Sequence, residues 1–266
     1  MIQSNVFLRE LRLGRRSLII WTGVVVLFVA IYLGFFPIMQ DPDMAKVVEA
    51  YPEAIKQVFN LTGVMFTDVN LYHAGIVLPY ILLLTSIFAL MLAGSLVSRD
   101  ADLGTAEFLY TKPVTRNQLL ASKVSAFLVM LTLLWAITFV TSTIVGFMAA
   151  GNQYRMGLQL PVHLAGLVAT VAAGGLAFAL APFINQVQGT TYLGVGVGLG
   201  FFLLHALSGL SARLENLRYL TLYYYADFRG AATGEPFIAG MAALLAVFLA
   251  GTGLGFLFLN RKEFTG

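Results

Sequence analysis

The chain has 266 residues, of which 59% are hydrophobic and only 11% are charged, and its mean hydropathy is +0.83. A water-soluble domain carries about 25% charged residues, so this composition excludes a soluble globular protein and predicts an all-α integral membrane protein. The net charge of +3 gives no support to nucleic-acid binding. With no cysteine, the chain cannot form disulfides or cysteine-ligated metal sites.

Six apolar stretches are each long enough to cross a membrane as a helix, for which about 20 mainly apolar residues are needed. A short polar turn that includes Asn185, Gln186 and Gly189 separates the fourth stretch from the fifth. The sequence therefore predicts a single transmembrane domain over residues 1–266. In chain order, the predicted spans cover residues 18–39, 74–97, 124–150, 162–184, 192–210 and 237–259.

A basic segment, residues 4–16, comes directly before the first predicted span. Apolar residues alternate there with Arg9, Arg12, Arg15 and Arg16, a composition typical of an amphipathic helix that lies in the membrane interface. We expect such an in-plane helix at the N-terminus. An ordinary basic flank of the first span explains the arginines equally well and stays an alternative.

Residues 40–73, between the first and second spans, are long enough to fold. Asp41 followed by Pro42 is typical of a helix N-cap with proline at the first helical position. Apolar residues continue at helical spacing on both sides of Pro52. The segment predicts two short amphipathic helices that rest on the membrane.

The charged interruption between the second and third spans, residues 98–123, is called the elbow below. Thr115 and Gln118 have the spacing of a capping box, so we expect a helix that starts next to Thr115 and runs into the third span. Pro113 disfavours helix just before it, and Gly104 allows a tight turn. The pattern predicts a folded helix–turn–helix that stands in water, where a soluble partner can act on it.

Glycine is concentrated in the fifth predicted span and recurs in the last one. Residues of this size at GxxxG spacing let helices approach closely where lipid supplies no hydrophobic drive for association. The pattern predicts packing surfaces, either within the chain or across a dimer. The glycines concerned are Gly194, Gly196, Gly198, Gly200, Gly251 and Gly255.

The segment 211–236 is rich in tyrosine, with Tyr223, Tyr224 and Tyr225 in a row. An aromatic belt at the membrane interface is the first interpretation, and a substrate-gripping patch is the alternative. With the predicted span boundaries, His205 is the only titratable side chain well inside a span. It is therefore a candidate substrate contact. A histidine bonded to a neighbouring helix carbonyl, or lying near the interface, is the simpler explanation.

Positive charge predicts the orientation, because cytoplasmic flanks of membrane helices carry an excess of Lys and Arg. With both termini in the cytoplasm, ten basic residues lie inside and six outside. Five acidic residues lie inside and eight outside, which gives net charges of +5 and −2. We therefore expect a multi-pass protein of the plasma membrane, surrounded by lipid, with both termini and the elbow in the cytoplasm.

No catalytic or metal-ligating pattern occurs in the sequence. An HExxH pair, a GxSxG nucleophile turn and the Walker A pattern GxxxxGK[ST] are all missing. We therefore expect no catalytic residue, no metal and no cofactor on this chain. Any ATP-driven work then needs another subunit.

Between the second and third spans, the elbow contains in order Asp102, Gly104, Thr105, Glu107, Lys112, Pro113, Val114, Arg116 and Lys123. This order is similar to the signature segment of type-2 ABC exporter permeases. The resemblance covers essentially the whole chain. It includes the six spans, the basic entry helix, the short turn between spans four and five, the aromatic segment before the last span, and the basic tail. One departure is that the elbow has a single glutamate, with aspartates at 100 and 102. The elbow residues singled out as a partner-binding surface are Arg99, Asp100, Asp102, Gly104, Thr105, Glu107, Lys112, Pro113, Val114, Arg116 and Lys123.

The resemblance implies a division of labour. Two permease chains, identical or different, form the transmembrane unit, and separate cytoplasmic ABC ATPase subunits bind ATP and Mg beneath it. The elbow is then the coupling helix that contacts the ATPase, and an amphipathic lipid, peptide or drug is the expected substrate. The alternatives are a non-transporting scaffold or regulatory subunit that docks a soluble partner, and a permease that transmits force to an outer partner. An ion-coupled carrier is disfavoured because the predicted spans contain no charged residue.

Overall fold

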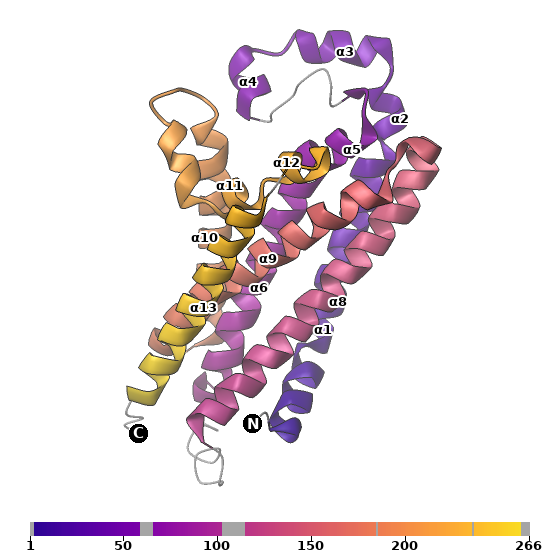
Figure 1. Cartoon of the computed structure of the whole chain (residues 1–266). Coiled ribbons are helices and arrows are strands. Elements are labelled where there is room, and N and C mark those ends of the chain that lie inside the picture. Colours follow the sequence, from indigo (N-terminus) through magenta and orange to yellow (C-terminus); the bar gives the residue numbers. More distant parts are fainter. Residues whose placement is uncertain (1–2, 59–65, 103–114, 185, 236, 262–266) are drawn as a thin grey trace.

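The computed structural model describes residues 3–58, 66–102, 115–184, 186–235 and 237–261. Within these ranges all regular structure is helical, and six helices are long and apolar enough to cross a membrane. The prediction of an all-α membrane fold with six spans is therefore confirmed. The long helices run roughly alongside one another, and the first begins at the end of the bundle where the last one finishes (Figure 1). We call this the terminal end and the opposite one the distal end.

The long helices extend beyond most of the apolar stretches that mark the spans. Hydropathy locates the part of a helix that suits hydrocarbon, whereas the backbone hydrogen bonds continue wherever side chains allow. Both helices that flank the elbow therefore carry polar turns at the terminal end. The long helices are α1 (Ser4–Gly34), α6 (Leu78–Asp102), α8 (Arg116–Ala150), α9 (Met156–Leu180), α10 (Val187–Ser208) and α13 (Ile238–Arg261).

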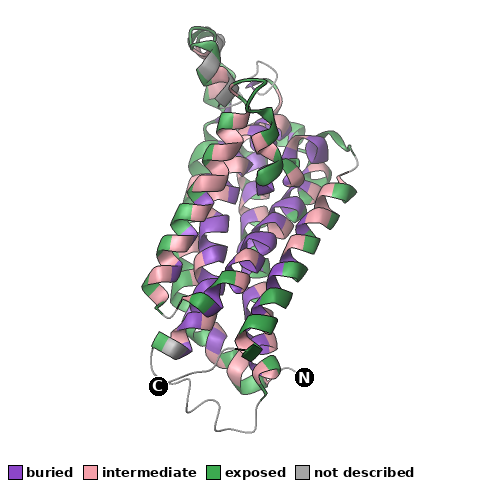
Figure 2. Cartoon of the chain, turned by 90° about the vertical axis from the view of Figure 1, so that its left-hand side faces the viewer, coloured by how far each residue is buried: buried purple, intermediate pink, exposed green. Residues whose placement is uncertain are grey.

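Helices α6 and α9 form the centre of the bundle. In each of them 67% of the most apolar stretch is buried, against 17% in α10. Helix α1 packs along α8, α10 along α6, and α13 along α9. Figure 2 shows the buried residues along the interior and the exposed ones along the outer faces. Large exposed side chains such as Ile19 and Leu249 are apolar, as a surface that faces lipid requires.

The expectation of a separate in-plane helix at the N-terminus is wrong. Residues 4–16 form the first turns of α1, which continues without a break to Gly34. No proline interrupts this helix, and Glu10 is fully buried against its neighbours instead of facing lipid headgroups. Gly14 brings α1 close to α8, because a Cβ there would lie 2.6 Å from the sulfur of Met130. The basic turns therefore extend the first span.

Most of the short helices lie at the distal end (Figure 1). As predicted, Asp41 caps a helix by accepting the N–H of Asp43 at 2.9 Å. Two short helices follow, as expected: α3 (Pro42–Glu49) and α4 (Glu53–Val58). The remaining short elements of the described chain are α2 (Phe36–Met39), α5 (Val69–Tyr72), the π-helical turn η2 (His73–Val77), η3 (Gly151–Gln153), η4 (Ala181–Phe183), η5 (Glu215–Leu220), α11 (Leu222–Ala226) and α12 (Phe228–Thr233).

Candidate functional site

The elbow begins and ends inside helices. Helix α6 continues to Asp102, and α8 starts directly after Thr115. The predicted capping box is confirmed, because the Thr115 hydroxyl accepts the N–H of Gln118 at 3.2 Å and the Gln118 side chain accepts the N–H of Thr115 at 3.1 Å. The middle of the elbow, residues 103–114, lies outside the described residues. The site can therefore be built from the two helix ends that hold it.

Five charged side chains meet where α1, α6 and α8 approach one another at the terminal end. A carboxylate oxygen of Glu10, which is fully buried, lies 3.1 Å from Lys123 Nζ. Arg99 and Arg9 approach the carboxylate of Glu10 at 3.5 and 3.6 Å. Asp100 lies 2.8 Å from Lys123 Nζ and 3.1 Å from a guanidinium nitrogen of Arg9. We call Arg9, Glu10, Arg99, Asp100 and Lys123 the buried charge cluster.

The buried charge cluster ties the three helices into one arrangement. Charges taken out of water are tolerated only where good geometry and further hydrogen bonds compensate for the lost hydration. Lys123 meets this condition, because it contacts both carboxylates and also donates to the carbonyl of Leu96. Sliding or tilting one helix would separate these charges where little water can replace the lost contacts. The terminal ends of α1, α6 and α8 are therefore expected to move together.

The expectation that the whole elbow stands in water is wrong at both of its ends. Only 7% of Asp100 and 3% of Lys123 are exposed. The physical reason is Glu10, which sequence reasoning missed: from a distant part of the chain it brings a second carboxylate to Lys123, which also pairs with Asp100. The available signal was a lone acidic residue inside the basic segment 4–16.

Two further contacts join the elbow to α10 and α13. Asp102 Oδ2 accepts the N–H of Val187 at 3.3 Å, at the start of α10, where the helix dipole favours a carboxylate. Arg116 donates to the carbonyl of Leu259 at 2.8 Å, in the last turn of α13. A displacement of the elbow therefore acts on the ends of α1, α10 and α13 as well as on α6 and α8.

The residues predicted to bind a partner thus fall into three groups. Three of them, Arg99, Asp100 and Lys123, join the buried charge cluster. Asp102 and Arg116 contact the ends of other helices. Six of them lie outside the described residues: Gly104, Thr105, Glu107, Lys112, Pro113 and Val114. Direct contact with a partner stays a prediction for all of these residues.

The predicted glycine pairs have different surroundings. A Cβ on Gly194 would lie 2.6 Å from the side chain of Met91 on α6. One on Gly251 would collide with the backbone of Gly175 on α9. A Cβ on Gly196 or Gly200 would have no described atom within 4 Å, apart from those of its own helix backbone. The close pairs therefore serve contacts within the chain, and packing across a dimer stays a prediction for the open pair.

Three histidines, His73, His163 and His205, lie near the distal end. His205 stacks on Tyr223 with ring centroids 5.0 Å apart. The interpretation of His205 as the only titratable side chain well inside a span is wrong, since His73 and His163 lie buried in the bundle. The extension of the helices past the apolar stretches explains His73, and His163 lies just inside the predicted fourth span.

Amide and imidazole groups form a second buried cluster. His73 Nδ1 lies 2.8 Å from Gln159 Oε1, and Gln159 Nε2 donates to Asn70 Oδ1 at 3.3 Å. Asn70 also donates to the carbonyl of Gln153 at 2.9 Å, and His163 Nδ1 lies 2.8 Å from the carbonyl of Gln159. We call Asn70, His73, Gln159 and His163 the distal polar cluster. Within the part of the chain that the structure describes, no group of three His, Asp or Glu side chains is placed to hold a metal ion.

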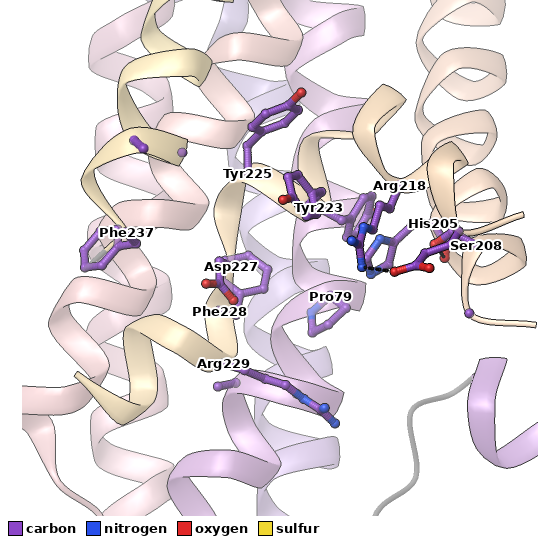
Figure 3. Close-up of a pocket in the computed structure, with 17 residues that line it drawn as sticks. Pro79, His205, Ser208, Arg218, Tyr223, Tyr225, Asp227, Phe228, Arg229 and Phe237 are labelled. Atoms are coloured by element: carbon purple, nitrogen blue, oxygen red, sulfur yellow. Dashed lines mark hydrogen bonds and ion pairs between the residues drawn. The ribbon is translucent and has the colours of Figure 1, made fainter. Parts of the chain in front are cut away.

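The tyrosine-rich segment is only partly an exposed belt. Tyr219 and Tyr224 are 43% and 39% exposed, whereas Tyr223 is 5% exposed. Burial raises the pKa of the Tyr223 hydroxyl above its usual range. Tyr223, Tyr225 and Phe228 lie in the wall of a cavity that also includes His205 (Figure 3). The segment thus has exposed rings and rings in the wall of a cavity, and both interpretations of it stay predictions.

Comparison with known proteins decides the family. A family model described as an ABC-2 family transporter protein matches residues 4–263. The chain belongs to the ABC-2 transporter family. Its six apolar helices make it a multi-pass membrane member of that family. The chain is also similar to YhcI of Bacillus subtilis (strain 168), described as an uncharacterized protein, with 27% identity over 190 residues. That match covers 63% of this chain and 58% of the relative, so the chain matches less than two thirds of the relative's length.

Proposed function

We propose that this chain is the permease subunit of an ATP-driven ABC exporter, with both termini and the elbow in the cytoplasm. The observation that carries the proposal is the attachment of the elbow: its two ends contact α1, α10 and α13 through Glu10, Val187 and Leu259. A segment joined in this way to most of the spans is suited to convert an external push into helix movement. Membership of the ABC-2 transporter family supports the same function.

The work is done by separate subunits in this proposal. The sequence has no Walker A pattern, so ATP and Mg bind to a pair of cytoplasmic ABC ATPase subunits. When these close around ATP, they displace residues 103–114, and the buried charge cluster carries the ends of α1, α6 and α8 with them. The contacts of Asp102 and Arg116 pass the displacement to α10 and α13.

A second permease chain completes the transmembrane unit. The open glycines Gly196 and Gly200, together with exposed Leu199 and Leu203 on α10, offer an apolar face for it. Small residues favour close helix contact in lipid. Most buried side chains of the bundle are apolar, which suits an amphipathic substrate such as a lipid, peptide or drug better than a hydrated ion.

The test is to reconstitute the chain in vesicles with the ATPase that co-purifies with it and to measure ATP hydrolysis and efflux together. Glu107→Ala is expected to leave assembly unchanged and to lower the number of substrate molecules moved per ATP. Glu235→Ala is the matched control, because Glu235 is an exposed glutamate outside the elbow. Unchanged transport in Glu107→Ala contradicts the coupling role, and ATP hydrolysis by the purified chain alone contradicts the division of labour.

A force-transmitting or regulatory subunit is the second candidate. It shares the attached elbow, which moves helices whether or not a solute crosses. The same vesicles separate the two, since substrate-stimulated ATPase activity with net efflux supports the exporter. ATP hydrolysis that responds only to a bound outer partner, with no efflux of any lipid, peptide or drug tested, supports the second candidate.

A further inference from the structure

A cavity of about 620 Å³ lies at the distal end of the bundle. Its wall is formed by η2 and the start of α6, the end of α10, the segment from η5 to α12, and the start of α13. Figure 3 shows Pro79, His205, Tyr223, Asp227 and Arg229 around it. The cavity thus spans the boundary between the apolar helices and the polar segment that joins two of them. A ligand that fits here needs an apolar and a polar part.

Polar atoms in the wall of the cavity are buried without a hydrogen-bond partner in the described chain. They include the hydroxyl of Tyr223, Nδ1 of His205 and Nε of Arg218. The Tyr223 side chain is almost fully buried, and its ring stacks on that of His205. Burying a donor or acceptor without a partner is unfavourable, so such a group calls for a partner that the chain itself does not supply. A bound ligand that offers hydrogen-bond acceptors provides one.

The wall carries charges of both signs. Glu215 and Arg218 form an ion pair at 2.9 Å, and Asp227 and Arg229 add a second carboxylate and a second guanidinium. The Arg218 guanidinium also lies 5.2 Å from the centre of the Tyr224 ring. A wall of a single sign would select an ion of the opposite sign. A wall with two charges of each sign favours a ligand that carries both an anionic and a cationic group.

The apolar side of the cavity consists of small or flat residues. Ala74, Gly75, Pro79 and Gly240 line it together with Phe237. These residues lie at the ends of helices that are apolar enough to cross a membrane. Lipid headgroups lie at the depth where membrane-crossing helices end, and the acyl chains extend from there along the helices. The cavity therefore has the layout of a site for one lipid molecule, with its polar end among the charged groups.

We propose that this cavity binds a phospholipid whose headgroup carries a phosphate and an ammonium group. The phosphate accepts hydrogen bonds from Arg218 and the Tyr223 hydroxyl, and the ammonium lies near the carboxylate of Asp227. The acyl chains extend past Pro79 and Phe237. The site belongs to a single chain, so it does not depend on the proposed ATP-driven transport, and its test needs no ATPase.

The test is native mass spectrometry of the purified, delipidated full chain with four probes. Dioleoyl phosphatidylethanolamine has both headgroup charges, dioleoyl phosphatidylglycerol has only the phosphate, dioleoylglycerol has neither, and free phosphoethanolamine lacks the acyl chains. We expect one phosphatidylethanolamine to bind about tenfold more tightly than phosphatidylglycerol, the effect of one charged contact. Neither dioleoylglycerol nor free phosphoethanolamine is expected to reach that affinity.

Matched variants link the binding to this cavity. Arg218→Gln and Tyr223→Phe are each expected to weaken phosphatidylethanolamine binding by about threefold to tenfold. Arg213→Gln and Tyr192→Phe, which alter exposed residues that do not line the cavity, are expected to leave it unchanged. Tyr223→Phe removes a hydroxyl that has no described partner, so it keeps the test valid if Arg218→Gln does not fold.

Three results overturn the proposal. One is equal binding of phosphatidylethanolamine and phosphatidylglycerol that neither cavity variant changes, which shows lipid bound only around the bundle. Another is tight binding of free phosphoethanolamine, which shows a site for a soluble ligand. The third is the absence of retained phosphatidylethanolamine in a folded chain. In support, a photoreactive phosphatidylethanolamine is expected to cross-link within residues 205–240 in the wild-type chain and less in Tyr223→Phe.

Discussion

The two ends of the bundle each hold a buried polar cluster, and the clusters differ in chemistry. At the terminal end, five charged side chains from α1, α6 and α8 meet within ion-pair distance. At the distal end, amide and imidazole groups of α5, η2 and α9 share hydrogen bonds. Both clusters join segments far apart in the sequence. Only the first lies beside the elbow, where an outside force is proposed to enter.

The difference in chemistry implies a difference in mechanical role. Breaking a buried ion pair leaves an uncompensated charge, whereas breaking a hydrogen bond between uncharged groups leaves a polar atom that water can more easily satisfy. The charge cluster therefore resists relative motion of its helices more strongly. We infer that the terminal end moves as a unit, and that the distal end is held together by weaker contacts which can rearrange.

Lys123→Met is expected to have the largest effect on stability. It leaves the carboxylates of Glu10 and Asp100 buried without their shared cation, so the free energy of unfolding should fall by about 3–5 kcal/mol. Reversible unfolding of the purified chain in mixed micelles measures the change.

Lys46→Met is the control for that substitution. Lys46 and Asp43 also form an ion pair, at 2.7 Å, but their side chains are 75% and 83% exposed. An exposed pair contributes only about 0–1 kcal/mol. Equal effects of the two substitutions would show that burial of the charge cluster does not stabilise the bundle.

Gln159→Leu tests the distal polar cluster and is expected to cost less. The substitution removes a partner from His73 and one from Asn70, and the loss should be about 1–3 kcal/mol, since no charge is left unpaired. Gln188→Leu is the control, because its bond to Tyr192 is exposed. A loss as large as that of Lys123→Met would remove the contrast between the two ends.

The sequence predicts well what local patterns determine, and poorly what distant contacts determine. The number of spans follows from apolar length, and the caps at Asp41 and Thr115 follow from residues next to the helix they start. The buried charge cluster could not be predicted in the same way, because Glu10 and Lys123 are brought together only by the packing of α1 on α8. The hydrogen bond between Gln159 and Asn70 could not be predicted for the same reason, because the two residues lie on different elements.

Thr115→Ala is expected to have a moderate effect, confined to the start of α8. The substitution removes the hydroxyl that accepts the N–H of Gln118, and an N-cap of this kind contributes about 1 kcal/mol. Thr115→Ser keeps the hydroxyl and should restore most of the loss. Hydrogen exchange of the amides of residues 116–120 measures the local opening. Protection that is unchanged in the alanine variant contradicts a role of the cap in holding the elbow.

Asp102→Asn is expected to have the smallest effect on stability. Its effect on the coupling of ATP hydrolysis to transport is expected to be larger than its effect on stability. The side chain of Asp102 is exposed, and its charge at the start of α10 contributes about 0.3–1 kcal/mol. If the elbow drives α10 through this contact, weakening it should lower the amount of substrate moved per ATP in reconstituted vesicles, while unfolding changes little. Lys123→Met would reduce both quantities, because it also disrupts the fold. Normal transport per ATP in Asp102→Asn would show that the displacement reaches α10 through the packing of α10 on α6 instead. The buried charge cluster would then be sufficient to make the helices at the terminal end move together.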